Sequence, residues 1–220
     1  MSSVALARAY QQSFAAHPYG TLAITNGTLN ALGDIVAQLT EKWVSQSACK
    51  TSSGPYREHW GYDLPRTMRF FLFGFAMGPV IGRWNFFLER HFPLRFQSTT
   101  PNGIGKVDIR ALSKRVAADQ LIMAPIGLAI FIGSMGIMEG RDRPHIRRKY
   151  AQLFYPALIA NWQVWPLAQL INFRFMPLPY RVPFQSSCGV FWTLYLSILN
   201  SAEAHRQKEL DAMEKMHSTD

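Results

Sequence analysis

Hydrophobic stretches without charge alternate with short charged segments along the chain. The clearest, Gln120 to Met138, holds 19 uncharged residues between Asp119 and Glu139. As an α-helix it would be about 28 Å long, close to the roughly 30 Å hydrocarbon core of a bilayer. Residues 150–173 and 182–202 are also free of charge and long enough to span a membrane. The pattern predicts three membrane-spanning helices in the C-terminal half.

The N-terminal half shows the same alternation less sharply. Residues 4–16 place apolar side chains at helical spacing until His17-Pro18 interrupts them, which predicts a short helix lying in the membrane interface. Residues 19–40 carry a single charged side chain, Asp34, and are long enough for a further span. The next segment, about 41–62, is rich in Ser, Lys and Gly and predicts a loop.

The segment at 67–89 combines aromatic residues with regularly spaced glycines. Gly74, Gly78 and Gly82 are four residues apart, so they share one helix face. Glycines at this spacing let two helix backbones approach closely, which matters in lipid because packing drives helix association there. The segment therefore predicts a spanning helix with a helix-packing face.

These segments predict an all-α protein, a polytopic transmembrane helix bundle of four to five hydrophobic helices with a short N-terminal interfacial helix. A polar, basic connection at 92–116 separates two of the spans. The tail, 203–220, alternates charges in helical fashion and predicts a solvated helix end. We expect residues 1–220 to form a single integral membrane domain, with spans at about 19–40, 67–89, 119–139, 150–173 and 182–202.

The overall charge of the chain is compatible with three kinds of partner. The formal net charge of the 220 residues is +9, which suits nucleic acid, an anionic membrane surface, or basic loops beside membrane spans. Basic residues are concentrated at 83–115 and 141–149. This segregation favours a membrane protein that contacts the lipid bilayer, and we expect no nucleic-acid partner. Because basic clusters lie on both sides of the 120–138 stretch, the orientation in the membrane stays open.

Polar side chains interrupt the hydrophobic stretch at 161–173. On a helical wheel Asn161, Trp165, Gln169 and Asn172 fall within about 80° of one another. Because an amide facing hydrocarbon costs free energy, this face should look toward other helices or toward water inside the bundle. Two interpretations stay open, a hydrated lining for a solute path and hydrogen bonding between helices.

A carboxylate inside the 19–40 span also needs a favourable environment. Asp34 lies one helical turn from Gln38. Because a charge near a bilayer centre costs roughly 2.5 to 3.5 kcal/mol, Asp34 should pair with an arginine, face a cavity, be protonated, or lie close to the hydrated interface. Arg69 is the preferred partner.

Charged residues at the ends of other spans have two interpretations each. Asp119, followed by Gln120, suits either a helix-end anchor or a gate residue. Arg174 and Arg181 flank a short Pro-containing turn, where they would attract anions to a vestibule or contact lipid headgroups.

Catalytic and metal-binding patterns are absent from the sequence. The two cysteines, Cys49 and Cys188, lie far apart and have no Cys or His partner at metal-ligand spacing. The six histidines are scattered without H-E-x-x-H, and neither G-x-S-x-G nor a Walker-type glycine loop occurs. We therefore expect no enzyme activity, no cofactor and no metal site.

Several local patterns together match one known family. The C-terminal pattern comprises Asn161, Trp162, Trp165, Pro166, Gln169, Asn172, Phe173, Pro177, Arg181, Trp192, Tyr195, Leu196 and Ser197. Earlier patterns agree in order: Gly33-Asp34 with Gln38, Arg66 with Arg69, Gly78-Pro79 with Trp84, and Asp119-Gln120 with Pro125. In these positions the chain resembles the family of the 22-kDa peroxisomal membrane protein and the mitochondrial inner-membrane protein Mpv-seventeen, over roughly residues 10–200.

The chain departs from the family pattern at a few positions. Family members commonly have His and then Trp-Tyr after the Gly-Pro pair, where this chain has Gly82 and Trp84-Asn85. It also has Thr193 after Trp192, where Asn is usual.

The resemblance implies an integral membrane protein of an organelle, in the mitochondrial inner membrane or alternatively the peroxisomal membrane. It also implies a channel for small solutes. The bundle would then enclose a path for small polar solutes, lined by Asp34, Gln38, Asn161, Gln169 and Asn172. The alternative is a non-conducting scaffold that uses its glycine faces to form a homo-oligomer or a complex with other membrane proteins.

Overall fold

The computed structural model describes residues 3–49, 61–94 and 108–194, and every regular element in these ranges is a helix. Two helices precede the first gap, α1 (Ser3–Ala16) and α2 (Pro18–Cys49), and α3 (Leu64–His91) follows it. Next come α4 (Ile109–Ala118), the π-helical turn η1 (Asp119–Met123), α5 (Ala124–Met138) and α6 (Arg143–Phe175), and then a helix over 178–194.

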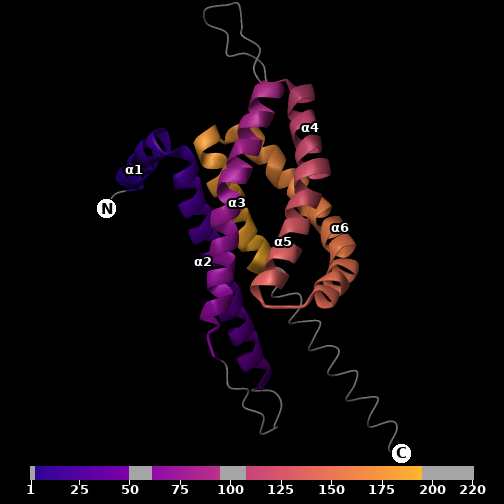
Figure 1. The fold of residues 1–220 in the computed structure, drawn as a ribbon. Helices are drawn as coiled ribbons and strands as arrows, with labels where there is room; N and C mark the ends of the chain where they lie inside the picture. Colours follow the sequence, from indigo (N-terminus) through magenta and orange to yellow (C-terminus); the bar gives the residue numbers. More distant parts are fainter. Residues whose placement is uncertain (1–2, 50–60, 95–107, 195–220) are drawn as a thin grey trace, which may run out of the picture.

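The long helices form an antiparallel bundle (Figure 1). α2 and α3 make the most extensive contact, and α4, η1 and α5 form one continuous rod that runs back along α3. α6 packs mainly against α5 and α4, and the helix over 178–194 reverses direction once more.

α1 lies across one end of the bundle and leads directly into α2 (Figure 1). The Tyr10 hydroxyl donates to the Pro179 carbonyl at 2.7 Å, which ties α1 to the start of the last helix. Burial, together with the neighbouring Tyr180 phenol, raises the pKa of Tyr10 to about 12, so this hydroxyl keeps its proton at physiological pH.

Three helices begin at an aspartate that caps them. Asp63 and Asp108 each accept from a backbone N–H of the first turn at 2.8 Å, and Asp142 does so at 3.2 Å. Pro65 and Pro144 follow at first-turn positions, where the missing N–H costs nothing. These local signals explain why α3, α4 and α6 begin where they do.

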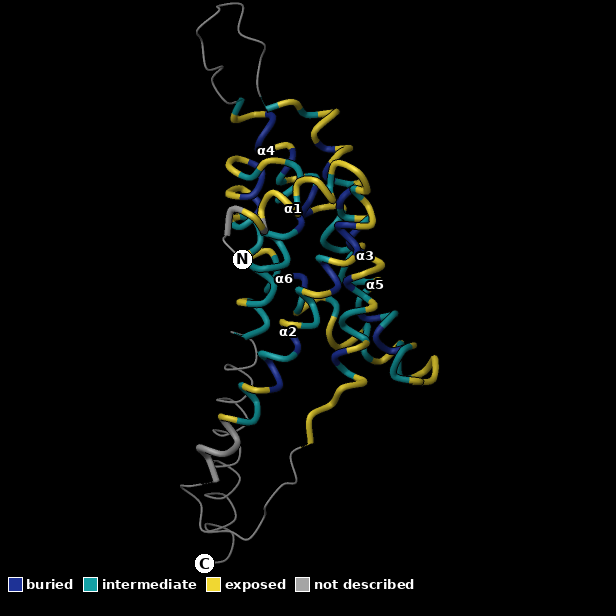
Figure 2. The backbone as a smooth tube through the Cα atoms, turned by 90° about the vertical axis from the view of Figure 1, so that its left-hand side faces the viewer, coloured by how far each residue is buried: buried dark blue, intermediate teal, exposed yellow. Residues whose placement is uncertain are grey.

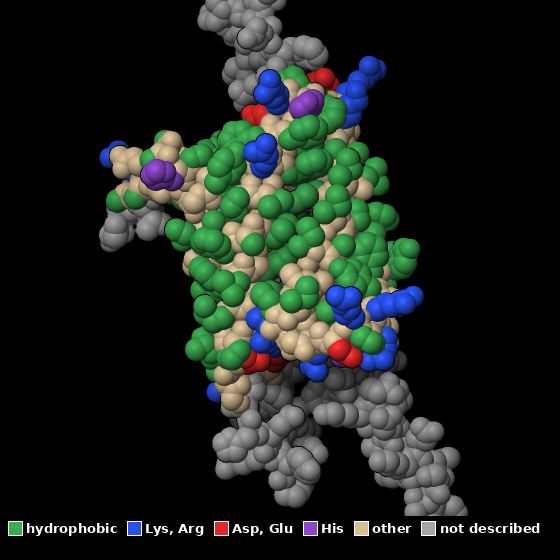
Figure 3. Space-filling model, viewed as in Figure 1, with side chains coloured by type: hydrophobic (Ala, Val, Ile, Leu, Met, Phe, Trp, Pro, Cys, Tyr) green, Lys and Arg blue, Asp and Glu red, His purple; other side chains and the backbone are tan. Residues whose placement is uncertain are grey.

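Apolar side chains cover the middle of the face of the bundle shown in Figure 3. On the α4–α5 rod, Leu121, Ile126, Ile130 and Ile137 are between 43% and 71% exposed, whereas charged side chains gather at the two ends. Exposed residues recur along the outer sides of the helices in Figure 2 as well. A continuous exposed apolar surface of this kind marks contact with a membrane.

Within the described residues, two helices are long and apolar enough to cross a membrane. They are Leu64–His91, whose most apolar 18-residue stretch has a mean hydropathy of 1.2, and the rod Ile109–Met138, where the corresponding value is 2.1. Only 33% and 17% of these apolar stretches are buried inside the protein, whereas the core helix of a soluble protein is mostly buried. The all-helical fold is confirmed, whereas the expected four to five spans stay a prediction.

Several helix ends differ from the sequence-based expectation. The loop expected at 41–62 is wrong at its start, because α2 continues to Cys49. The connection expected at 92–116 contains the first part of α4, and α6 begins at Arg143 rather than near 150. The break expected at 174–181 is confined to residues 176–177. Uncharged stretches mark only the part of a helix suited to lipid, and these helices extend past it with polar residues. The expected tail, 203–220, lies outside the described residues.

Candidate functional site

The π-helical turn η1 directs two adjacent polar side chains into the bundle. Within it the Ala124 N–H bonds to the Asp119 carbonyl, five residues back. Pro125 has no N–H to offer the next carbonyl, that of Gln120, which accepts instead from Trp162 Nε1 at 2.9 Å. Asp119 and Gln120 are both buried as a result of this local geometry.

Asp119 is the centre of a buried hydrogen-bond network. Its Oδ1 accepts from Trp84 Nε1 at 3.0 Å, and its Oδ2 accepts from Gln169 Nε2 at 2.7 Å and Gln120 Nε2 at 3.0 Å. Asn172 Nδ2 in turn donates to Gln169 Oε1 at 2.9 Å. These residues, from α3, η1 and α6, are called the Asp119 cluster below. Four predicted site residues, Asp119, Gln120, Gln169 and Asn172, therefore lie together.

Arg181 joins this cluster to the end of α3. Asn172 Nδ2 also donates to the Arg181 carbonyl at 3.3 Å, and Arg181 Nη1 lies 2.6 Å from Glu89 Oε2. The side chain of Arg181 is 5% exposed, so this predicted site residue is held inside the protein by an ion pair rather than reaching toward lipid headgroups.

The sequence analysis missed Arg115, which is 1% exposed. Its Nε donates to the Phe92 carbonyl at 2.7 Å. Arg115 was assigned to a polar connection, yet it lies four residues before Asp119 and therefore shares the inward face of the same rod. That spacing is the signal that could have identified it.

Several polar atoms around the Asp119 cluster have no hydrogen-bond partner among the described residues. They are Gln120 Oε1, Asn172 Oδ1, Asn161 Oδ1 and Arg115 Nη1. A buried polar atom without a partner costs roughly 1–3 kcal/mol, and such atoms are commonly satisfied by buried water. The cluster thus offers donors and acceptors to water or to a small polar molecule.

A second buried polar group, the Asp34 cluster, lies between α2 and α3. Asp34 Oδ2 accepts from Thr67 Oγ1 at 2.6 Å and from Gln38 Nε2 at 2.8 Å. Arg66 Nε lies 2.8 Å from Asp34 Oδ1, and the same guanidinium donates twice to Glu41, at 3.1 and 3.2 Å. Gln38 and Asp34, both predicted site residues, therefore lie in one network with Arg66.

The preferred pairing of Asp34 with Arg69 is wrong. Arg66 holds the carboxylate, whereas Arg69 Nη2 lies 3.7 Å from Asp63 Oδ2. Three residues further along a helix, a side chain is rotated by about 60° from the first, and Arg69 consequently lines the side of α3 near α5. The side chain of Asp34 is fully buried within the protein.

Two asparagines of α2 form a further group of polar contacts next to the Asp34 cluster. Asn26 Nδ2 donates to the Gly74 carbonyl at 2.6 Å, and Ser186 Oγ from the last helix bonds to Asn26 Oδ1. Asn30 Nδ2 donates to the Asn26 carbonyl at 2.8 Å. Neither asparagine was predicted as a site residue, although each lies four residues from the next polar residue toward Asp34.

The polar face predicted on α6 is divided in the structure. Gln169 and Asn172 are buried in the Asp119 cluster. Asn161 and Trp165 are partly buried, and Trp165 lies about 4.0 Å from the Cβ position of Gly189 on the last helix. Trp165 is thus placed for packing between two helices.

The three glycines of α3 face α2 of the same chain. A Cβ at Gly78 would lie 2.5 Å from the Leu22 carbonyl oxygen, and one at Gly74 would lie 2.7 Å from the Asn26 carbonyl oxygen. At Gly82 the nearest atom is Leu22 Cδ1, at 2.3 Å, which belongs to a flexible side chain. The close approach predicted for these glycines is made within the chain.

Among the described residues, no group of three or more His, Cys, Asp or Glu side chains is placed to hold a metal ion. The interior site is built from amides, guanidinium groups, single carboxylates and indole N–H groups. These groups donate and accept hydrogen bonds and several of them carry charge.

Comparison with known proteins identifies relatives over most of the chain. Residues 136–197 match the model of the Mpv17 / PMP22 family. The chain is 37% identical over 196 residues to "Protein SYM1" of Gibberella zeae, covering 88% of this chain and 97% of that protein. It is 34% identical to "Protein sym1" of Schizosaccharomyces pombe, covering 88% and 90%, and 34% identical to "Protein SYM1" of Saccharomyces cerevisiae, covering 90% and 92%. No solved structure matches the chain significantly.

Proposed function

Because the chain belongs to the Mpv17 / PMP22 family and carries an exposed apolar surface on the face seen in Figure 3, we propose that it is a channel-like protein of an organelle membrane. Small polar solutes would cross through the interior of its helix bundle. We further propose the mitochondrial inner membrane as its location, with the peroxisomal membrane as the alternative, as the family resemblance implies.

Five membrane crossings are part of this proposal. α2, α3, the α4–α5 rod, α6 and the helix over 178–194 run alternately up and down the bundle (Figure 1). Their alternation gives the polar interior a surrounding wall of helices. Among the described residues, α3 and the rod alone meet the length and hydropathy expected of a span on their own.

Polar residues of α2 supply one side of the proposed path. Asn26, Asn30, Asp34 and Gln38 recur every four residues, so they follow one helix face over about 18 Å. Ser186 contacts Asn26 from the last helix, and on that helix Arg181, five residues earlier, contacts Asn172. A series of polar groups therefore leads from the Asp34 cluster to the Asp119 cluster.

The observation that carries the proposal is the set of buried polar atoms at Gln120, Asn172 and Asn161 that find no partner within the part of the chain that the structure describes. A bundle held together only by interhelical hydrogen bonds would gain from pairing these atoms. Acceptors left open along an interior face favour an interior that exchanges contacts with water and solute, and weak contacts of this kind let a solute leave as well as enter.

The test is solute flux through the purified chain in proteoliposomes and planar bilayers. We expect Asn172→Leu and Gln169→Leu each to lower flux at least fivefold. Gln163→Leu is the matched control, because it removes an amide from the exposed side of the same helix, and it should leave flux unchanged. A wild-type chain that is inserted yet silent across voltage and pH would overturn the channel proposal.

A scaffold role is the alternative proposal, and one observation weighs against a scaffold that assembles through its glycine faces. The glycine face of α3, which would have joined another subunit, is covered by α2. A scaffold would need a different surface, such as the exposed face of α5. If Asn172→Leu and Gln169→Leu retain function in cells while substitutions on that face abolish it, the scaffold replaces the channel.

A further inference from the structure

A cavity of about 240 Å³ opens between α3, α5 and α6, on the side of α3 next to the Asp34 cluster, whose Arg66 also lines it. Arg69 contributes one cationic wall from α3, and Lys149 contributes another from α6. Arg66 and the acidic residue Glu139 also line the cavity, and the rest of its wall is apolar, with Phe70 from α3, Phe131 from α5 and Leu153 from α6. A single cavity thus combines cations with aromatic and aliphatic surface.

The cationic groups are only partly engaged by carboxylates. Lys149 Nζ lies 2.9 Å from Glu139 Oε2, a carboxylate that Arg141 also approaches at 3.6 Å. Arg69 is 3.7 Å from Asp63, which is too long for a hydrogen bond. Arg69 and Lys149 therefore keep N–H donors for an anion, whereas Arg66, the third cation at this cavity, is committed to Asp34 and Glu41.

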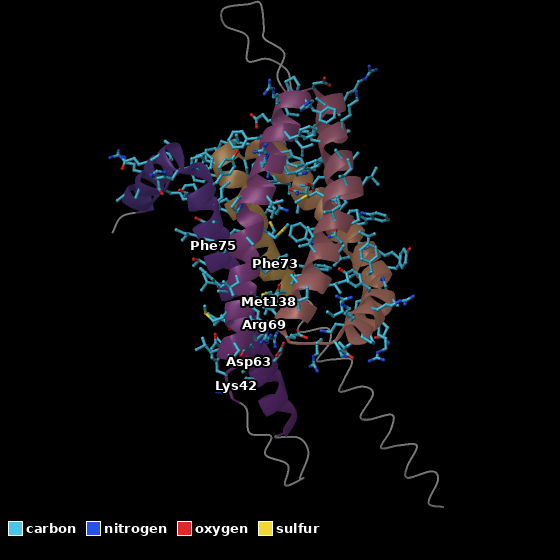
Figure 4. The ribbon with its side chains drawn as sticks, viewed as in Figure 1. Lys42, Asp63, Arg69, Phe73, Phe75 and Met138 are labelled. Carbon is cyan, nitrogen blue, oxygen red and sulfur yellow. The ribbon has the colours of Figure 1, made fainter. Side chains whose placement is uncertain are left out.

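The cavity lies where the apolar surface of the bundle meets its charged end. In Figure 4 Arg69 lies at about the level of Met138, at the end of α5, and Asp63 and Lys42 lie further toward the same end of the bundle. In Figure 3 the same end of the molecule shows clustered Lys and Arg side chains below the apolar band. The first turns of α6 add exposed Arg143, Arg147 and Arg148 around a neighbouring hollow. This level of a membrane protein is where lipid headgroups are found.

We propose that this cavity binds an anionic phospholipid. Its phosphate would accept hydrogen bonds from Arg69 and Lys149. The part of an acyl chain nearest the headgroup would lie against Phe131 and Leu153. Phe70 and Phe73 both pack on the Phe131 ring, with centroids 6.0 and 5.1 Å apart, so the apolar wall is firmly held. Leu153 is 49% exposed and leaves the cavity open toward the surrounding lipid.

The apolar wall distinguishes a lipid from a free phosphate compound. Both ligands offer the same phosphate oxygens to Arg69 and Lys149. A soluble phosphate compound gains nothing from Phe131 or Leu153, whereas a lipid buries hydrocarbon against them. The two sources are therefore separable by experiment.

The experiment measures lipid retention and thermal stabilisation of the full chain purified in detergent. Phosphatidylglycerol is the probe, phosphatidylcholine is the neutral lipid control, and glycerol phosphate is the soluble control. We expect phosphatidylglycerol alone to be retained in native mass spectra and to raise the unfolding temperature. Arg69→Gln and Lys149→Gln should each weaken its binding about tenfold.

Two further variants keep the test decisive. Arg147→Gln removes a charge from the same end of the bundle outside the cavity and should change binding less than twofold. Leu153→Trp fills the open side of the cavity without changing any charge, and should weaken binding about tenfold even if Arg69→Gln fails to fold.

Four results would overturn the proposal. Equal loss on Arg147→Gln would show diffuse attraction to a basic surface, and equal retention of phosphatidylcholine would show that charge is irrelevant. Stabilisation by glycerol phosphate as strong as that by the lipid would make this a soluble phosphate site. Unchanged binding in folded Arg69→Gln, Lys149→Gln and Leu153→Trp chains would place the lipid elsewhere. None of these readouts depends on solute flux, so the lipid site and the proposed channel can fail separately.

Discussion

At the scale of single residues, the two interior aspartates are stabilised in different ways. Asp34 is held by the Arg66 guanidinium in addition to Thr67 and Gln38. Among the described residues, Asp119 accepts hydrogen bonds from neutral groups, an indole and two amides. Burial of a carboxylate costs less free energy when its oxygens have hydrogen-bond or ion-pair partners. Asp34 is therefore suited to joining helices, whereas Asp119 has no cationic partner among the described residues.

The pairing of Asp34 can be tested by a double-mutant cycle. Asp34→Asn and Arg66→Gln, made singly and together, should show a coupling free energy of about 0.5–3 kcal/mol, because the two groups are in contact. The measurement is the free energy of unfolding in mixed micelles. The same cycle with Arg69→Gln should be additive within about 0.5 kcal/mol, and a larger coupling with Arg69 would contradict the observed pairing.

Glu139, which follows α5, gives a pH-dependent contribution. Its hydrogen bond from Lys149, and more weakly the charges of Lys149, Arg141 and Arg69, lower the pKa of the Glu139 carboxyl below its ordinary value of 4.5. Because the folded-state pKa is the lower one, this stabilisation is present above pH 4.5 and is lost as the pH falls through the folded pKa.

Unfolding temperatures measured between pH 6 and pH 3 should therefore fall less steeply for Glu139→Gln than for the unmodified chain. The Lys149–Glu139 pair should contribute less than about 1 kcal/mol to the free energy of unfolding, since both side chains are partly exposed. Identical pH profiles for the two chains would refute this contribution.

At the scale of elements, the contact between α2 and α3 depends on missing side chains. Glycines on α3 let its backbone approach the Leu22 and Asn26 carbonyls, and the Asn26 amide then reaches the Gly74 carbonyl. This hydrogen bond requires the two helices to be close. Small residues and a polar bond therefore act together at one interface, as is common between helices in membranes.

Alanine substitutions should rank these glycines by the atoms they meet. Gly78→Ala should destabilise the chain by about 1–3 kcal/mol, because its Cβ would meet backbone atoms. Gly82→Ala should cost less, since Leu22 can change its rotamer. Gly127→Ala on α5 is the control: no atom lies within 4 Å of its Cβ position, and the change should be neutral or stabilise by up to about 1 kcal/mol. Unfolding in mixed micelles measures the series, and a reversed order would contradict this packing.

At the scale of the whole molecule, the α4–α5 rod determines which ends of the bundle lie on the same side. α4 begins at the end of the bundle opposite to the start of α6, and the rod joins the two ends without a break (Figure 1). If the rod crosses the membrane once, the start of α4 and the start of α6 face different compartments.

Cysteine labelling tests this arrangement. Arg110→Cys and Arg143→Cys are each introduced into a chain whose Cys49 and Cys188 have been replaced by serine. In sealed vesicles of uniform orientation, an impermeant maleimide should label one variant at once and the other after the membrane is permeabilised. Immediate labelling of both variants would contradict a single crossing by the rod.

The family and the all-helical fold could be predicted from the sequence, because both depend on features that are local in the chain. Uncharged stretches mark the middles of helices, and the pattern Asn161 to Phe173 with Arg181 marks the family. Helix ends were predicted less well. α2 and α6 extend several residues past their uncharged parts, and only the caps at Asp63, Asp108 and Asp142 show where helices begin.

Contacts between distant segments could not be predicted in the same way. The choice of Arg66 over Arg69 depends on the rotation of α3 relative to α2, and the sequence does not specify that angle. The burial of Arg115 depends on the rod continuing through η1, which a basic, proline-containing connection conceals. The meeting of Asp119 with Gln169, 50 residues later, requires the packing of α4 on α6.

The π-helical turn at η1 affects the orientation of the side chains on the rod without determining the length of the rod. A π turn holds one residue more than an α turn, so η1 is equivalent to a single inserted residue in an otherwise regular helix. The side chain of Leu121 is 66% exposed and faces away from the bundle. Deleting Leu121 would restore the α-helical register and leave the faces of α4 and α5 in phase. The rod would keep its apolar length while Asp119 and Gln120 changed their orientation relative to α5, so the apolar length of the rod and the geometry of the polar interior would respond differently to the loss of one residue.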